Sequence, residues 1–200
     1  VRRQRQMCIR DSCWVVDPLD GTSNYIHDCT PYCVSIALRN REEILLGVVY
    51  ECGREELFWA HKNSRAYLNG KEICVSDQSV LDQSFIMPEL PYKAERYSPF
   101  ILPLMRDLYG HVSGIRMLGS AAAELCYVAA GRFEIFIEAF LGPWDIAAGY
   151  IILKQAGGRM TDFSGNSNGP DAKEVLASNG KVHEELLKVL QRHKKLLKHE

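Results

Sequence analysis

The sequence predicts one globular α/β domain, mostly antiparallel in its first half and alternating between strands and helices in its second. Three observations support this expectation. Short β-rich runs separated by tight-turn residues fill the first half, and stretches with helix start and stop signals enter after residue 84. The 200 residues are 46% hydrophobic and 24% charged. A chain of this size and composition is typical of globular proteins and buries roughly 70% of its unfolded surface.

The strands expected in the first half are apolar runs bounded by turn residues. The first, Trp14–Asp17, should end at Pro18, which has no amide hydrogen for the ladder. The next runs are Cys33–Arg39, Glu43–Glu51 and Leu57–His61. A hairpin dipeptide, Asn69-Gly70, then separates Tyr67-Leu68 from Ile73–Val75. Such short strands with tight connections indicate a mainly antiparallel sheet.

The second half begins with a strand at Ser84–Met87 and continues with helices that have clear ends. One helix spans Ser120–Ala130, with Ser120 as its N-cap and Gly131 just past its end. After a strand at Phe133–Glu138, another helix begins at Pro143, runs over Trp144–Ala156 and stops at two glycines. An amphipathic helix over Val182–Leu197 ends the domain.

Charge and composition exclude several classes of protein. The formal net charge is −1, which offers no basic face to a nucleic acid. No apolar run approaches the ~18 residues that a membrane-spanning helix needs. The seven cysteines are odd in number and irregularly spaced, so we expect reduced thiols and a cytoplasmic protein rather than a disulfide scaffold.

Residues 1–13 differ from the rest of the chain. They contain four arginines and no glutamate, and they show no apolar periodicity. A secretory signal would need an apolar stretch of about 7–15 residues after its charges. A short basic arm for nucleic acid is a weaker alternative. We therefore expect a non-native or disordered leader at 1–13 and the domain itself at 14–200.

The densest polar segment is 17–22, which reads Asp-Pro-Leu-Asp-Gly-Thr. Taken alone, these residue types are more often a turn than a site. Here, however, Asp17 ends a strand, and the fixed backbone of Pro18 lets Asp17 and Asp20 converge with the Leu19 carbonyl between them. Oxygen ligands that converge on one spot suit a hard cation such as Mg²⁺. The amides of Gly21 and Thr22 follow where a phosphate could bind.

Two further segments have plain structural explanations when each is taken alone. Asp145 lies in the first turn of the helix that begins at Pro143, where the helix dipole favours a carboxylate by under about 1 kcal/mol. The run Gly119-Ser120-Ala121 begins another helix, where simple capping is the default. Glu138 ends a strand and would by default be a surface residue or a salt-bridge partner.

Together these segments resemble the inositol monophosphatase family. Residues 14–27, Trp-Val-Val-Asp-Pro-Leu-Asp-Gly-Thr-Ser-Asn-Tyr-Ile-His, are similar to its first signature. Residues 144–149, Trp-Asp-Ile-Ala-Ala-Gly, through the glycines at 157 and 158 are similar to its second. The resemblance runs from Trp14 to the last helix. It implies a layered α-β-α-β-α sandwich whose N-terminal helices are missing here, and a homodimer as the common assembly.

The resemblance also implies a site, residue by residue. Asp17 and the Leu19 carbonyl would bind one Mg²⁺, and Asp17, Asp20 and Asp145 would surround a second, within a set of two or three ions. Thr22 would orient the attacking water, and the amides of Gly21 and Thr22 would contact the phosphate beside Asp20 and Asp145. The substrate's hydroxyl-bearing ring would lie against Gly119, Ser120, Ala121 and Glu138. Asp17 and Thr22 are thus the expected catalytic residues. The metals would neutralise the phosphate, activate a water and stabilise the leaving alkoxide.

One departure bears on activity. The family carries a Glu-Glu pair upstream of the first signature, and residues 1–13 contain no glutamate. We therefore expect weak or absent turnover from this chain. The substrate expected is an inositol monophosphate, because residues 23–27 resemble that branch, and lithium sensitivity would accompany it. The alternatives are a sugar-phosphate or nucleotide phosphatase with the same metals, and a catalytically impaired fragment that binds metal or phosphate.

Overall fold

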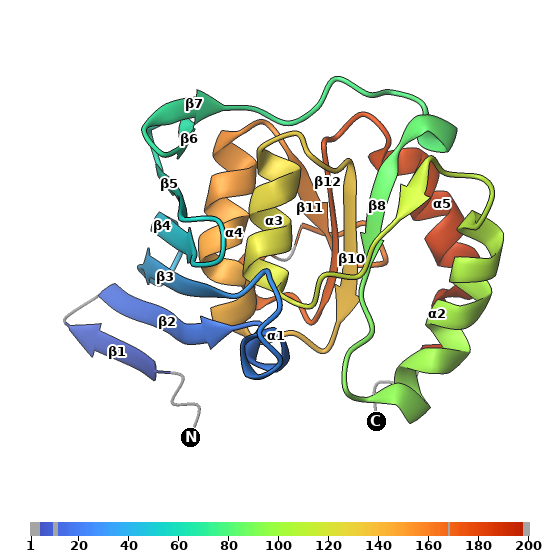
Figure 1. The fold of residues 1–200 in the computed structure, drawn as a ribbon, viewed down its shortest axis with the longest axis horizontal. Helices are drawn as coiled ribbons and strands as arrows, with labels where there is room; N and C mark the ends of the chain where they lie inside the picture. Colours follow the sequence, from blue (N-terminus) through green and yellow to red (C-terminus); the bar gives the residue numbers. More distant parts are fainter. Residues whose placement is uncertain (1–4, 10–11, 168, 198–200) are drawn as a thin grey trace.

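Two sheets alternate with two layers of helices (Figure 1). The computed structural model describes residues 5–9, 12–167 and 169–197, with side chains described from residue 12. A seven-stranded sheet packs on α3 (Ala121–Ala129) and α4 (Pro143–Gln155). A five-stranded sheet follows, and α2 (Ala94–Leu108) and α5 (His183–Lys194) cover its far face. This is the layered sandwich that the family resemblance implied, without its first helical layer in the described part of the chain.

The first sheet is a meander in which each strand pairs antiparallel with the next, as predicted. Its strands are β1 (Arg5–Ile9), β2 (Ser12–Asp20), β3 (Cys33–Arg39), β4 (Ile44–Glu51), β5 (Glu56–His61), β6 (Ala66–Leu68) and β7 (Lys71–Ile73). Asn69 and Gly70 both have positive φ, 47° and 78°, as the predicted hairpin turn requires. Because a two-residue turn pairs its immediate neighbours, the second hairpin strand is Lys71–Ile73 and not Ile73–Val75.

Pro18 does not end the first predicted strand. β2 continues through it to Asp20, and the pairing with β3 becomes irregular between Asp17 and Asp20. A proline is tolerated there because an irregular stretch of ladder does not need its missing amide hydrogen.

The predicted leader lies partly outside the described residues. Residues 1–4 and 10–11 are not described, while Arg5–Ile9 form β1 beside β2. That residues 1–13 are foreign to the domain stays a prediction. Cys13 is in a disulfide, so the expectation of reduced thiols throughout is wrong at this position. Five other cysteines are free, of which Cys29 and Cys74 are exposed.

The second sheet is mixed. Its order is β11-β12-β10-β8-β9, from β8 (Phe85–Pro88), β9 (Gly114–Ile115), β10 (Ile135–Ala139), β11 (Arg159–Thr161) and β12 (Glu174–Ser178). β10 pairs parallel with β8 and antiparallel with β12. The parallel pair brings the carboxyl ends of β8 and β10 to the same edge, and this edge faces the end of β2.

The helices confirm most of the sequence expectations. α3 and α4 begin and end within one residue of the predicted bounds, and Gly131 has the positive φ of a residue just past a helix end. α5 begins one residue later than predicted and ends at Lys194. A short helix, α1 (Thr22–Ile26), and two single-turn 3₁₀ segments, Leu81–Gln83 and Gly169–Asp171, complete the described elements. None of the described helices is long and apolar enough to cross a membrane.

Candidate active site

Asp17 and Asp20 lie side by side at the end of β2 because the strand is irregular there. Asp17 pairs with Ser35 and Asp20 with Cys33, so two residues of β2 oppose a single residue of β3. Residues three apart in a regular strand point to opposite faces. The extra residue of this bulge returns both carboxylates to the inner face, where they are buried. The sequence alone did not indicate this bulge.

Hydrogen bonds hold the two aspartates and the turn that follows them. Asp17 Oδ1 accepts the Leu19 amide at 3.1 Å, and the Thr22 hydroxyl donates to the Leu19 carbonyl at 2.9 Å. Gly21 has φ +78°, and a Cβ there would lie 2.7 Å from the Pro31 carbonyl oxygen. Glycine is therefore required at the point where β2 passes into α1.

Asp20 is held by groups from three parts of the fold. Its Oδ1 accepts the Gly21 amide at 3.0 Å, and its Oδ2 accepts the Ser120 hydroxyl at 2.7 Å and the Ala122 amide at 2.9 Å. The Cys33 thiol is 3.7 Å from the same oxygen. Ser120 is the N-cap residue of α3, as predicted, but its hydroxyl binds Asp20 rather than capping the helix.

Asp145 reaches the same place from the N-terminus of α4. Its Oδ2 accepts the Gly142 amide at 2.8 Å, which fixes the carboxylate in the first helical turn. One carboxylate oxygen from each of Asp17, Asp20 and Asp145 lies within 4.8 Å of the others. The structure thus brings together three residues that the sequence places up to 128 positions apart.

The donor set fits a hard divalent cation. All three side chains offer carboxylate oxygen, the ligand that Mg²⁺ prefers. Three negative charges so close together repel one another at low dielectric. A bound dication would remove that repulsion. The Leu19 carbonyl, which the resemblance implies as a further ligand, accepts the Thr22 hydroxyl here.

A cavity of about 390 Å³ opens beside the three aspartates. Seven predicted site residues line it, namely Asp20, Gly21, Thr22, Gly119, Ala121, Glu138 and Asp145. Ser120 does not line the cavity; it is buried behind the wall, with its hydroxyl on Asp20. Asp17 and Leu19 are not among the residues that line the cavity.

The cavity wall is acidic. Four carboxyl groups line it, from Asp20, Glu89, Glu138 and Asp145, against one cationic side chain, Lys93. Burial raises the pKa of Glu138 well above its usual range, and the neighbouring carboxylates of Glu89, Asp20 and Asp145 raise it further. A cavity with this wall favours a cation or ligand hydroxyl groups over a bare anion.

Sequence reasoning missed the segment 89–93, which supplies five of the lining residues. Glu89 follows the end of β8, Tyr92 OH lies 2.6 Å from Ser23 Oγ on α1, and the Lys93 ammonium lies over the Phe140 ring. A signal was present, because loops at the carboxyl ends of parallel strands often line binding sites. It could not be used while the parallel pairing of β8 with β10 was unknown.

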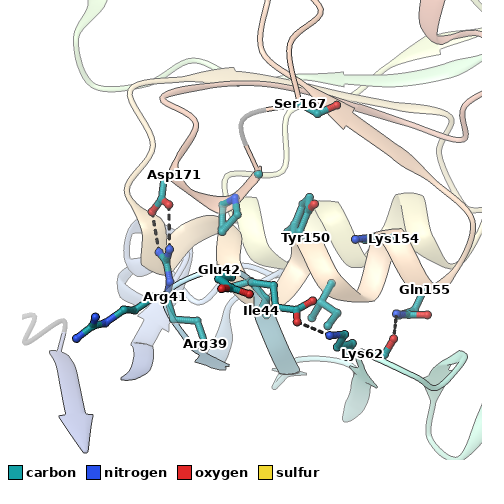
Figure 2. Close-up of a pocket in the computed structure, with 14 residues that line it drawn as sticks. Arg39, Arg41, Glu42, Ile44, Lys62, Tyr150, Lys154, Gln155, Ser167 and Asp171 are labelled. Carbon is teal, nitrogen blue, oxygen red and sulfur yellow. Dashed lines mark hydrogen bonds and ion pairs between the residues drawn. The ribbon is translucent and has the colours of Figure 1, made fainter. Parts of the chain in front are cut away.

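A second cavity, of about 430 Å³, lies at the other end of α4 and contains none of the predicted site residues (Figure 2). Several of its charged groups are paired with one another. Arg39 makes two hydrogen bonds with Asp171, at 2.7 and 3.0 Å, and Lys62 pairs with Glu43. Since these cations are already neutralised, the hollow lacks the converging charge of the first cavity.

Comparisons with known proteins agree with this geometry. The profile described as "Inositol monophosphatase family" matches residues 6–195. The chain is 38% identical over 180 residues to the fructose-1,6-bisphosphatase/inositol-1-monophosphatase of Thermotoga maritima, which covers 90% of this chain and 68% of that protein. It is 38% identical over 178 residues to the Nus factor SuhB of Escherichia coli K12, covering 89% and 67%. The solved structure of Thermotoga maritima IMPase matches with a TM-score of 0.87 and 35% identity, over 96% of this chain and 73% of that one.

Proposed function

This chain belongs to the inositol monophosphatase family, and on that premise we propose that it is a Mg²⁺-dependent phosphatase acting on inositol monophosphate. The observation that carries the proposal is the convergence of Asp17, Asp20 and Asp145 beside a cavity large enough for a small phosphate ester. A soluble cytoplasmic homodimer is the assembly we propose with it.

The three aspartates would hold the metal, with the Leu19 carbonyl as a further ligand. Bound Mg²⁺ would neutralise the phosphate, make a water more acidic and stabilise the leaving alkoxide. The chain's own groups would position the reactants. The Thr22 hydroxyl, which donates to the Leu19 carbonyl here, is the group we propose to orient the attacking water. The amide of Thr22 is the proposed contact to the phosphate; that of Gly21 already donates to Asp20.

The polyol part of the substrate would lie against the opposite wall. A carboxylate accepts hydrogen bonds from ring hydroxyls, and Glu138 lines the cavity together with Gly119 and Ala121. Ser120 would act from behind the wall by holding Asp20. We propose that this acidic wall selects a neutral, hydroxyl-rich alcohol over an anionic one.

A sugar-phosphate phosphatase is the second candidate. The printed name of the Thermotoga maritima relative includes fructose-1,6-bisphosphatase. Lys93, the one cation among the described lining residues, could pair with a second phosphate.

The Escherichia coli relative is named a Nus factor, and the net charge of −1 here does not favour a nucleic-acid partner. A chain that binds metal or phosphate without turnover is the third candidate.

Phosphate release with and without Mg²⁺ tests the proposal. The substrates are inositol 1-phosphate, fructose 1,6-bisphosphate and adenosine 2′-monophosphate. We expect Mg²⁺-dependent phosphate release with a preference for inositol 1-phosphate. We expect the Asp20→Asn substitution to abolish this release. Asp77→Asn is the matched control, since Asp77 is fully exposed and paired with Lys181. Preference for the bisphosphate would select the second candidate. A folded chain that binds Mg²⁺ without turnover would identify an impaired fragment.

A further inference from the structure

Two buried carboxyl groups accept hydrogen bonds from the turn that precedes α3. Glu89 lies just past β8, and its Oε1 accepts the Leu118 amide at 2.6 Å. Glu124 lies in the first turn of α3, and its Oε2 accepts the Ser120 amide at 3.3 Å. These two amides flank Gly119, whose φ of +75° makes the turn. The turn is therefore held by one carboxyl group on each side of its glycine.

Glu124 is unusual among the glutamates of this chain. It is fully buried, and its Oε1 makes no hydrogen bond with any described residue. Burial raises the pKa of Glu124 well above its usual range, and the carboxylates of Glu89, Glu138 and Asp20 raise it further. A raised pKa favours the protonated form of Glu124, whose O–H can donate a hydrogen bond. Among these neighbours, Glu89 has the largest effect on the pKa of Glu124. It is therefore the natural acceptor for a hydrogen bond from the Glu124 O–H.

The turn held in this way carries the contacts that fix Asp20. The Ser120 hydroxyl and the Ala122 amide both donate to Asp20 Oδ2, at 2.7 and 2.9 Å. On its other side, the Leu118 carbonyl accepts a hydrogen bond from Asn24 on α1 at 2.6 Å. A shift of this turn would therefore move the groups that orient Asp20.

We propose that Glu89 and Glu124 form a carboxyl clamp that fixes the turn at residues 118–120 and so positions Ser120 against Asp20. Glu124 does not line the cavity and is a positioning residue that acts through the turn. Glu89 holds the same turn and also lines the cavity. The clamp itself does not depend on the reaction. Its consequence for turnover rests on the proposed function.

Amide hydrogen exchange at Leu118 and Ser120, followed by NMR on the whole chain without Mg²⁺ or substrate, tests the clamp directly. Glu124→Ala should speed exchange at Ser120 about tenfold, since an opened hydrogen bond to a carboxyl group is worth roughly 1.4 kcal/mol. Glu89→Ala should do the same at Leu118. Glu124→Gln keeps a carbonyl for Ser120 and an N–H for Glu89, so exchange should stay within about threefold of the unsubstituted protein.

The control is Glu134→Ala. Glu134 is another buried glutamate that accepts a backbone amide, that of Phe85, but it does not touch the turn. It should lower global stability without selective exchange at Leu118 and Ser120. Unchanged exchange in both alanine variants, or a glutamine variant that behaves like alanine, would overturn the clamp. If Glu124→Ala does not fold, Glu89→Ala and Glu124→Gln still decide the question.

A kinetic readout separates the clamp from the proposed function. With Mg²⁺ and inositol 1-phosphate, Glu124→Ala should lower kcat about tenfold at nearly constant KM, and Glu124→Gln should restore kcat. An unsubstituted protein with no activity would count against the proposed function and leave the exchange experiment unaffected. Equal loss of kcat in the glutamine variant would overturn the positioning role.

Discussion

At the scale of single residues, the site is defined by buried polar groups whose partners can be named. Asp20 accepts hydrogen bonds from the turn after β2 and from the start of α3, so its orientation does not depend on one contact. Asp145 is fixed by the Gly142 amide. Neither arrangement neutralises the charge of the three-aspartate group. The mutual repulsion of the three carboxylates lowers the stability of the metal-free fold, and a bound cation would remove it.

Asp145→Asn should change stability in opposite directions with and without metal. Without Mg²⁺ the variant should unfold at a higher temperature, because one of three crowded charges is gone. Mg²⁺ at 100 times its Kd should stabilise the unsubstituted protein by about 2.7 kcal/mol and the variant far less. Thermal unfolding with and without Mg²⁺ measures both effects, with Asp77→Asn as the control. An undiminished Mg²⁺ shift in Asp145→Asn would contradict the metal site.

His183 should make stability depend on pH. Its ring is fully buried between the hydroxyls of Thr161 and Ser178, at 3.0 and 2.8 Å. Burial, and to a lesser degree Arg159, lowers its pKa from 6.5 to about 4. The unfolded state therefore binds the proton first. The neutral His183 ring therefore contributes its full share of the free energy of unfolding above about pH 6.5. This contribution is lost as pH falls toward 4, and the total loss is at most about 3 kcal/mol.

Denaturant unfolding at pH 7 and at pH 4.5 checks this pH dependence. The unsubstituted protein should lose about 2 kcal/mol more than His183→Gln over this interval. Glu124 and Glu138 have raised pKa values and act in the opposite direction. Because both proteins contain them, the difference between the proteins isolates His183. Equal losses would show that protonation of His183 does not destabilise the fold.

At the scale of elements, α4 connects the site to the sheet. The helix lies so close to β4 that a Cβ on Gly47 would meet the Ala148 carbonyl oxygen and Ile151 Cγ2, both at 2.6 Å. The same helix carries Asp145 at its first turn. The close approach of α4 to the sheet therefore sets where this carboxylate lies relative to Asp17 and Asp20.

Gly47→Ala should move α4 and weaken the metal site. The clash involves backbone as well as a side chain, so we expect a loss of about 1–3 kcal/mol of stability. Mg²⁺ affinity should fall at the same time, because Asp145 moves with the helix. Unfolding in denaturant and Mg²⁺ titration calorimetry provide the two readouts. Val48→Ala, on the opposite face of the same strand, should leave Mg²⁺ affinity unchanged. If both variants bind Mg²⁺ normally, α4 does not set the position of Asp145.

At the scale of the whole molecule, the first sheet has one covered and one open face. α3 and α4 lie on one side of it, and no helix in the described part of the chain lies on the other (Figure 1). The open face is nonetheless apolar, and its residues are neighbours across the strands. They include Trp14 beside Leu38, Val16 beside Ile36, Ile36 beside Val48, Val48 beside Trp59, and Tyr50 beside Leu57. Contiguous apolar surface of this kind favours association.

We expect this chain to bind a hydrophobic dye and to self-associate through the open face. Tyr50→Lys with Leu57→Lys should reduce dye fluorescence and concentration-dependent sedimentation. Both side chains are 39% exposed, so the fold should tolerate the charges. Leu102→Lys, an exposed position on α2, is the control. Weak dye fluorescence from the unsubstituted protein would refute this expectation.

Elements that depend on local chemistry were predictable from the sequence. The hairpin at Asn69-Gly70, the ends of α3 and the start of α4 at Pro143 all follow from residues that act on their immediate neighbours. α2 was not predicted, and Pro99 and Pro103 lie inside it. Its buried residues, Tyr97, Phe100, Ile101, Leu104 and Leu108, have helical spacing. Tertiary packing of this apolar face outweighs the cost of two prolines.

By itself, the sequence determined the antiparallel half of the fold, the family and the short segments that carry the charged groups. Each of these is encoded in residues close together along the chain. Only the tertiary structure decided that a bulge in β2 turns Asp17 and Asp20 to one face, and that α4 brings Asp145 to them. It also decided that the parallel pairing of β8 with β10 places Glu89 beside the cavity. These placements depend on how distant elements pack, and packing between elements is not encoded in any one segment of the chain.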